Sequence, residues 1–330
     1  MLHHNWNLSF EFPNFLGPYT NDILTYQGDA FASQGTIQLT KVINHTNVPN
    51  SVGRASYALP LRLTDSTNGE ASFITTFSFL IESNGSNSGD GIAFFIVPYN
   101  SSIPESSGGG YLGLFNPKYA TNALLNEIVA VEFDTYPNQW DPPFAHVGID
   151  VNSIESVKTV KWGIESVESI LTTVIVTVSY DALIHKLNVV VSYPENTRDV
   201  TTISLSSEVN LKAIMTTDWA SIGFSGATGL VDETHKILSW SFSSTMHYKT
   251  DLLEMILSLL LFTYTADLTR DLKESVFGHS LLGSLCADSI CADSICVSPI
   301  GLICTLLRIY SVSADFYYAQ SEPKRMNAEN

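Results

Sequence analysis

The chain has 330 residues, of which 45% are hydrophobic and 15% are charged, so it is neither disordered nor a coiled coil and can bury a sizeable core. Its 33 acidic and 16 basic residues give a formal net charge of −17. This balance argues against a nucleic-acid partner, because phosphate binding relies on clustered lysine and arginine, and it is compatible with cation binding.

The N-terminal segment 1–6 lacks the cationic and the apolar region of a signal peptide, so we expect a chain that is mature or incomplete at its start. Four glycosylation sequons permit secretion but do not establish it, since several arise by chance in a chain rich in Asn, Ser and Thr. They lie at Asn7, Asn44, Asn84 and Asn100.

From Leu8 to about Ser244 the sequence reads as strands separated by turns. Residues 72–81 alternate apolar and polar side chains with the two-residue period of a half-buried strand. Residues 172–180 and 186–193 are rich in β-branched side chains. The short segment between these two runs predicts a hairpin.

Two further runs, 91–97 and 128–133, are almost continuously apolar, as is typical of strands covered on both faces. Long amphipathic helical patterns are missing from residues 8–244. Many short strands with Gly, Pro, Asn and Ser turns indicate an all-β domain, either a β-sandwich or a jelly roll.

One strand end and the loop after it hold the densest group of metal-binding residue types. Glu132 and Asp134 are two residues apart on a predicted strand, so their side chains share one face. Asn138, Asp141 and His146 follow in a proline-rich loop that can fold back over them. The oxygen ligands suit Ca²⁺, and the part with the histidine suits Mn²⁺ or a similar metal. The alternative is a solvated acidic loop with His146 in the core.

Glu132 and Asp134 also resemble the start of a glycosidase acid/base pair. Retaining hydrolysis needs two carboxyl groups about 5 Å apart, on either side of the scissile bond. The next position on the same strand face holds Tyr136 instead of another carboxylate. The carboxylates are therefore interpreted as metal ligands, and the chain is predicted not to be an enzyme.

The composition changes after about Thr250. Residues 252–262 predict a helix, but the uncharged stretches 255–266 and 294–307 are shorter than the roughly 20 residues that span a bilayer, so no convincing membrane span is predicted. The spacing of the four cysteines is not a recognised zinc pattern. The favoured interpretation is a poorly ordered tail, with a membrane or metal role as the alternative. The cysteines are Cys286, Cys291, Cys296 and Cys304.

Six ordered motifs identify a family resemblance. They are Ser51-Val-Gly-Arg-Ala-Ser-Tyr-Ala-Leu-Pro60, Gly89-Asp-Gly-Ile-Ala-Phe-Phe-Ile-Val-Pro98, Gly108-Gly-Gly-Tyr-Leu-Gly-Leu-Phe115, Val131-Glu-Phe-Asp-Thr-Tyr-Pro-Asn138, His146-Val-Gly-Ile-Asp-Val-Asn-Ser153 and Ile237-Leu-Ser-Trp-Ser-Phe242. Together they make the chain resemble the legume lectins, the L-type carbohydrate-binding proteins. The resemblance implies a jelly-roll β-sandwich with a flat back sheet, a curved front sheet and a small connecting sheet. We assign this lectin domain to residues 8–245 and a helical or disordered C-terminal extension to residues 246–330.

The resemblance also implies two metal ions, with waters completing both coordination shells. Ca²⁺ would be held by Asp134, the carbonyl of Tyr136, Asn138 and Asp141. Mn²⁺ would be held by Glu132, Asp134, Asp141 and His146.

The sugar contacts implied by the family fall on the same region. Asp90 would follow a cis peptide bond and accept hydrogen bonds from two sugar hydroxyls. Asn138 would donate its side-chain amide N–H, Gly110 would donate a backbone N–H, and Tyr136 would form an aromatic wall. Gly89 stands where many members have alanine, and no harm is expected from that difference.

A further sugar-contacting loop spans residues 225–235, and Gly229, Leu230 and Val231 would offer backbone N–H groups. The loop has the short length typical of members that bind mannose and glucose. The segments 51–60 and 146–162 look more like those of a galactose-binding member. Because the loop touches ligand and those segments are framework, mannose/glucose binding is favoured and galactose stays open.

The predicted function is thus non-catalytic, Ca²⁺/Mn²⁺-dependent binding of glycans and glycoproteins. The alternatives are a lectin-fold defence or storage protein without sugar binding, a glycosidase on the same architecture, and the ectodomain of a receptor kinase. The family further implies a homo-oligomer, either a dimer or a tetramer. Together with the sequons, it also implies a secreted or vacuolar location.

Overall fold

The computed structural model describes residues 6–17, 20–43, 46–83, 89–162, 173–193, 202–231 and 233–248. The predictions for the helix at 252–262, the four cysteines and the sequons at Asn44 and Asn84 lie outside the described residues. Among the residues described, no helix has the length and apolar character needed to cross a membrane.

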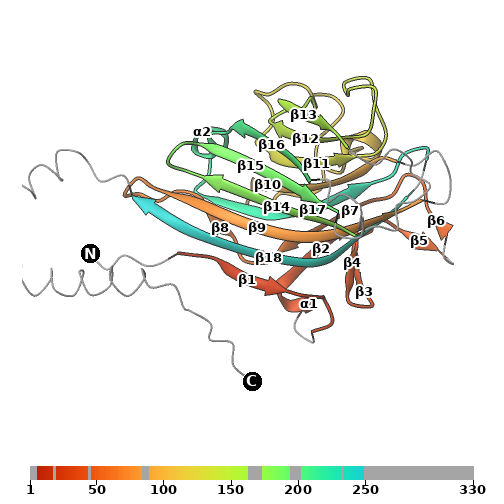
Figure 1. The fold of residues 1–330 in the computed structure, drawn as a ribbon, viewed down its shortest axis with the longest axis horizontal. Helices are drawn as coiled ribbons and strands as arrows, with labels where there is room; N and C mark the ends of the chain where they lie inside the picture. Colours follow the sequence, from red (N-terminus) through yellow and green to blue (C-terminus); the bar gives the residue numbers. More distant parts are fainter. Residues whose placement is uncertain are drawn as a thin grey trace, which may run out of the picture. The chain divides into compact units, whose positions relative to one another are not determined.

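The domain is built from two antiparallel sheets of eight strands each, joined by loops and a two-stranded sheet (Figure 1). One of them, here called the back sheet, contains the two longest strands, which lie side by side. In spatial order its strands are β16 (Thr202–Glu208), β15 (Lys186–Ser192), β14 (Val174–Asp181), β9 (Gly69–Glu82), β18 (Thr234–Tyr248), β4 (Thr36–Gln38) and β3 (Phe31–Ser33), with β1 (Ser9–Phe12) paired to β18.

The other sheet, here called the front sheet, carries the strands that end at the candidate site. In spatial order they are β13 (Lys158–Lys161), β12 (His146–Val151), β11 (Val129–Asp134), β10 (Gly91–Pro98), β17 (Trp219–Ala227), β7 (Val52–Tyr57) and β2 (Leu24–Gly28), with β8 (Leu61–Arg62) paired to β17. The remaining elements are β5 (Val42–Ile43), β6 (Thr46–Asn47), α1 (Thr20–Ile23), α2 (Leu211–Ile214) and the 3₁₀ helix η1 (Gly109–Tyr111).

The strand predictions and the β-sandwich are confirmed. β9 covers the predicted run 72–81, and its side chains alternate in burial from Phe73 onward, as its two-residue period requires. β14 and β15 pair in antiparallel fashion from Asp181 opposite Lys186, which is the predicted hairpin.

The space between the sheets is filled by side chains from β9 and β18 on one side and β10, β11 and β17 on the other. Aromatic rings dominate the centre: the ring of Phe77 lies 4.9 Å from that of Phe224 and 5.8 Å from that of Phe94. The ring nitrogen of Trp240 is also satisfied, because it donates to Thr75 Oγ1 at 2.9 Å. This core holds the front sheet in a fixed position.

A second apolar cluster covers the outer face of the front sheet. Phe95 and Val97 of β10 point away from the central core and pack with Leu112, Leu114 and Phe115 of the following segment. This second layer explains why the runs 91–97 and 128–133 are apolar on both faces. It also brings the loop with η1 over the sheet, next to the ends of β10 and β11.

The division at residue 245 remains a prediction, and a truncation tests it. Residues Met1–Thr250 form one compact unit, and β18, the last described strand, ends at Tyr248. A chain cut after Thr250 should therefore stay folded, with a melting temperature within a few degrees of the full chain. Circular dichroism of both chains measures this. Unfolding, or a large drop in melting temperature, would mean that residues 251–330 are integral to the domain.

Candidate functional site

The register of the front sheet assembles the predicted metal ligands. Glu132 lies on β11, and His146 opens β12 directly opposite Asp134. The ligand atoms of Glu132, Asp141 and His146 all lie within 4.8 Å of one another, and Nε2 of His146 is 2.9 Å from Oε1 of Glu132. Asp134 is buried beside them, and its Oδ1 accepts the backbone N–H of Tyr136 at 2.8 Å.

Burial and like charge make this cluster unfavourable without a cation. The pKa of Asp134 is raised well above its usual value by burial and then by the charges of Glu132 and Asp141. Burial likewise raises the pKa of Asp141 to about 6. Burial would lower the pKa of His146, but the hydrogen bond and charge of Glu132 outweigh it, so this pKa is raised. A divalent cation fits this donor set, because it would compensate the buried carboxylates.

Two residues that the sequence interpretation did not single out extend the cluster. Asp150 is fully buried on β12, on the same strand face as His146, and its Oδ2 has no hydrogen-bond partner within the described part of the chain. The hydroxyl of Ser156 lies 2.6 Å from Asp150 Oδ1 and 2.7 Å from Glu132 Oε1. The two-residue period from His146 to Asp150 was a usable signal for Asp150, whereas Ser156 is brought in only by folding.

Asp90 lies next to this cluster at the start of β10. The peptide bond between Gly89 and Asp90 is cis, as expected. The backbone of Asp90 is held on both sides, since its N–H donates to Ala227 O at 3.1 Å and its carbonyl accepts the N–H of Thr135 at 2.9 Å. The carboxylate is buried, and its pKa is raised to about 7 by burial first and then by the charge of Glu233.

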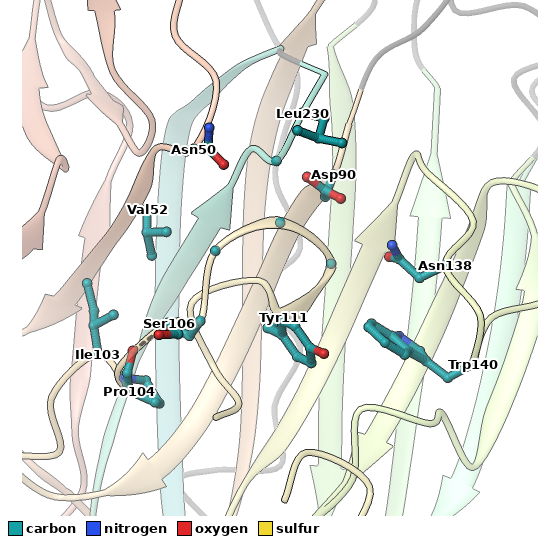
Figure 2. Close-up of a pocket in the computed structure, with 15 residues that line it drawn as sticks. Asn50, Val52, Asp90, Ile103, Pro104, Ser106, Tyr111, Asn138, Trp140 and Leu230 are labelled. Atoms are coloured by element: carbon teal, nitrogen blue, oxygen red, sulfur yellow. Dashed lines mark hydrogen bonds between the residues drawn. The ribbon is translucent and has the colours of Figure 1, made fainter. Parts of the chain in front are cut away.

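A depression of about 620 Å³ opens above Asp90 (Figure 2). Two of its polar atoms, Asp90 Oδ2 and Asn138 Oδ1, are buried and unpaired among the described residues. Asn138 is fixed by its backbone N–H, which donates to Asp141 Oδ2 at 2.7 Å. Gly110 must be a glycine for this arrangement, because a Cβ there would overlap Asn138 Oδ1. The depression thus offers two acceptors with no described partner beside the carboxylate cluster.

The structure brings most of the predicted sugar-contacting residues together, since Asp90, Gly110, Asn138, Gly229 and Leu230 all line the depression. The residues lining it do not include the other two, Tyr136 and Val231.

Tyr136 and Val231 instead flank Gly89, where a Cβ would lie 2.7 Å from Tyr136 Cβ and 2.9 Å from Val231 Cγ2. An alanine at position 89 would therefore require these two side chains to shift, whereas the glycine that this chain carries fits without strain. The aromatic residues in the depression are Tyr111 and Trp140, whose ring centroids are 5.0 Å apart. Sequence reasoning did not assign them to the site, although Trp140 stands between two predicted ligands.

The fold and the site match one family of proteins. A family model described as "Legume lectin domain" matches residues 7–254. The chain belongs to the legume lectin family. Agglutinin-2 of Cladrastis kentukea is 49% identical over 245 residues, which are 73% of this chain and 82% of that protein. The mannose/glucose-specific lectin of Centrolobium tomentosum is 45% identical over 249 residues, which are 73% of this chain and 97% of that protein.

A solved structure gives the same result at the level of the fold. The lectin from Bauhinia forficata in complex with GalNAc is 40% identical, covers 72% of this chain and 98% of that chain, and has a TM-score of 0.65. The predicted family, the lectin fold and the non-enzymatic class are therefore confirmed. As a legume lectin, the chain is a non-catalytic carbohydrate-binding protein.

The raised pKa values predict opposite pH responses with and without metal. In the chelated protein, the stabilisation from these protonated groups is complete below the unfolded carboxyl pKa of about 4. It is lost as the pH rises through the folded pKa values of Asp141, about 6, and Asp90, about 7. A bound cation keeps the carboxylates ionised and competes with protons, so its stabilisation grows with pH.

Melting temperatures measured from about pH 4.5 to 8, with chelator and with excess Mn²⁺, test this response. The gap between the two curves should widen as the pH rises. In Asp141→Asn, which lacks one of the titrating ligands, the gap should be smaller. Parallel curves for the native chain would contradict the assignment of the cluster as a cation site.

Proposed function

We propose that this chain binds glycans in a Ca²⁺- and Mn²⁺-dependent manner, with the sugar in the depression above Asp90. The observation that carries the proposal is a pair of buried oxygens, Asp90 Oδ2 and Asn138 Oδ1, that have no hydrogen-bond partner among the described residues and lie beside a cluster of carboxylates. A sugar hydroxyl donates to the first oxygen, and a cation is the natural partner of the second.

The two ions divide the donor set by chemistry. Ca²⁺ takes oxygen ligands, and Mn²⁺ also accepts an imidazole nitrogen such as Nε2 of His146. In this proposal the ions neutralise the buried carboxylates and hold Asn138 in place. Ca²⁺ is assigned to Asp134, the Tyr136 carbonyl, Asn138 and Asp141, and Mn²⁺ to Glu132, Asp134, Asp141 and His146.

The sugar is bound by this chain's own polar groups. Asp90 accepts from two hydroxyls, Asn138 donates through its side-chain amide, and Gly110 donates through its backbone N–H. The loop 229–231 closes the other side of the depression with its backbone, since the Leu230 side chain is 96% exposed and Val231 packs against Gly89. Tyr111 and Trp140 supply the apolar wall in the depression that was expected from Tyr136.

We favour a mannose/glucose-type ligand because the segment between β17 and β18, residues 228–233, is short. The names of the relatives do not decide the sugar, since one is a mannose/glucose-specific lectin and another structure holds GalNAc. A glycan array, run with and without chelator, tests both parts of the proposal. Binding to galactosides alone would reject the mannose/glucose assignment, and binding that survives chelation would reject the metal dependence.

Replacement of Asp90 by alanine should abolish sugar binding. The change removes a charged acceptor that no neighbour replaces, and such hydrogen bonds contribute about 1.5–3 kcal/mol each. Asn138→Ala should have a similar effect, because it removes both a sugar contact and a cation ligand. Isothermal titration calorimetry with methyl α-mannoside and methyl α-galactoside measures the affinity.

The matched control is Asp22→Ala, which removes an exposed carboxylate of α1 that does not line the depression. Its affinity should equal that of the native chain. Unchanged affinity in Asp90→Ala would place the sugar elsewhere.

Assembly and location also remain proposals. We expect a homo-oligomer, a dimer or tetramer formed through the back sheets, and a secreted or vacuolar protein. The sequon residues Asn7 and Asn100 are exposed and so accessible to glycosylation. Light scattering of the purified protein and mass spectrometry of the plant-expressed chain test these two expectations.

A further inference from the structure

A buried carboxylate lies behind the depression without lining it. Glu233 immediately precedes β18, and its side chain is fully buried. Its Oε1 accepts two hydrogen bonds, one from the hydroxyl of Thr135 at 2.7 Å and one from Nε2 of His235 at 2.8 Å. Its Oε2 has no hydrogen-bond partner among the described residues. Burying a carboxylate is costly unless it is hydrogen-bonded or paired, so the two bonds to Oε1 are what keep Glu233 in this position.

Thr135 connects Glu233 to the sugar-binding aspartate. It stands between two assigned cation ligands, Asp134 and Tyr136, and its backbone N–H donates to the carbonyl of Asp90 at 2.9 Å. Its hydroxyl lies 3.1 Å from the same carbonyl, but its single proton is taken by the shorter contact to the carboxylate. Both polar groups of Thr135 are thereby fixed, and with them the backbone of Asp90.

The other side of Glu233 is anchored in the back sheet region. Nδ1 of His235 lies 3.0 Å from the hydroxyl of Thr40, and the side-chain amide of Gln38 donates to the His235 carbonyl at 3.2 Å. With Nε2 of His235 donating to Glu233, Nδ1 faces the hydroxyl of Thr40, which also lies 3.4 Å from the backbone carbonyl of Glu233. The network therefore runs without interruption from β4 through Glu233 to Thr135.

Resting on the proposed function, we propose that Glu233 is a positioning residue for sugar binding. Its Oε1 ties together three segments of the site: the loop 228–233, the cation loop (residues 135–145, between β11 and β12) and the Asp90 backbone. The charge of Glu233 also acts on the Asp90 carboxylate, which agrees with their proximity. Loss of the Thr135–Glu233 hydrogen bond frees Asp90 to move relative to Gly229 and lowers sugar affinity, although neither Glu233 nor Thr135 is assigned a sugar contact.

The test uses the full chain at saturating Ca²⁺ and Mn²⁺, with methyl α-mannoside and methyl α-galactoside as probes. Thr135→Val keeps the shape of the side chain but removes the hydroxyl, and it should weaken binding by about tenfold. Thr135→Ser keeps the hydroxyl and should bind within about threefold of the native chain. Glu233→Ala and Glu233→Gln form a second pair, because glutamine keeps an acceptor oxygen and should preserve binding.

The control for general destabilisation is Thr75→Val in the back sheet. Thr75 is buried, donates to Ser241 O at 2.7 Å and accepts from Trp240, so its loss should lower the melting temperature without changing sugar affinity. Thr135→Val and Glu233→Ala remove the same hydrogen bond. The double variant should therefore bind no more weakly than whichever single variant binds sugar more weakly. If Glu233→Ala does not fold, the comparison of Thr135→Val with Thr135→Ser still tests the proposal.

Equal affinity of Thr135→Val and Thr135→Ser would overturn the proposal. So would a loss of affinity in Thr75→Val, or a loss of bound metal in Thr135→Val, because the effect would then come from stability or from the cation loop. Failure of the native chain to bind either probe, or any glycan on the array, would instead reject the proposed function itself. The two failures are thus distinguishable.

Discussion

Several carboxylates gathered at one edge of the front sheet impose the main physical constraint on this protein. Glu132, Asp134 and Asp150 are almost completely buried, and Asp141 and Asp90 lie beside them. Like charges in a poorly solvated site repel one another, so these groups either hold protons or surround a cation. Protons satisfy the charges but leave Asn138 Oδ1 unpaired, whereas a cation satisfies both. In the proposed function, sugar binding and cation binding are therefore coupled through the same few atoms.

The two-layered packing of the front sheet makes this arrangement possible. The central core fixes one face of β10 and β11, and the segment that follows β10 covers the other face. The same segment places Gly108–Gly110 over the sheet, where Asn138 approaches Gly110 too closely for any side chain. The shallow depression is thus built on strands that cannot shift without disturbing both apolar clusters.

The polar network around Glu233 lies behind the depression and holds the loop 228–233 in place, as the two apolar clusters hold the strands beneath it. Glu233 and His235 introduce two ionisable groups into a fully buried position, which is costly unless each is well bonded. Their partners are Gln38 of β4, Thr40 just after it and Thr135. The loop 228–233 is thereby attached both to the back sheet and to the segment that carries the proposed cation ligands. Leu230 of the same loop lines the depression while its side chain is almost fully exposed.

The sequence by itself determined the strands and the family, and it named most of the residues that the structure gathers at the candidate site. Two-residue periodicity located β9, and the spacing of Glu132 and Asp134 placed two carboxylates on one strand face, because both patterns depend only on local backbone geometry. Tertiary structure alone decided what lies across strands and loops. It placed Ser156 beside Glu132, Tyr111 and Trp140 in the depression in place of Tyr136, and Thr135 against Glu233. These contacts join residues far apart in the chain, so they depend on register and packing, which no local pattern encodes.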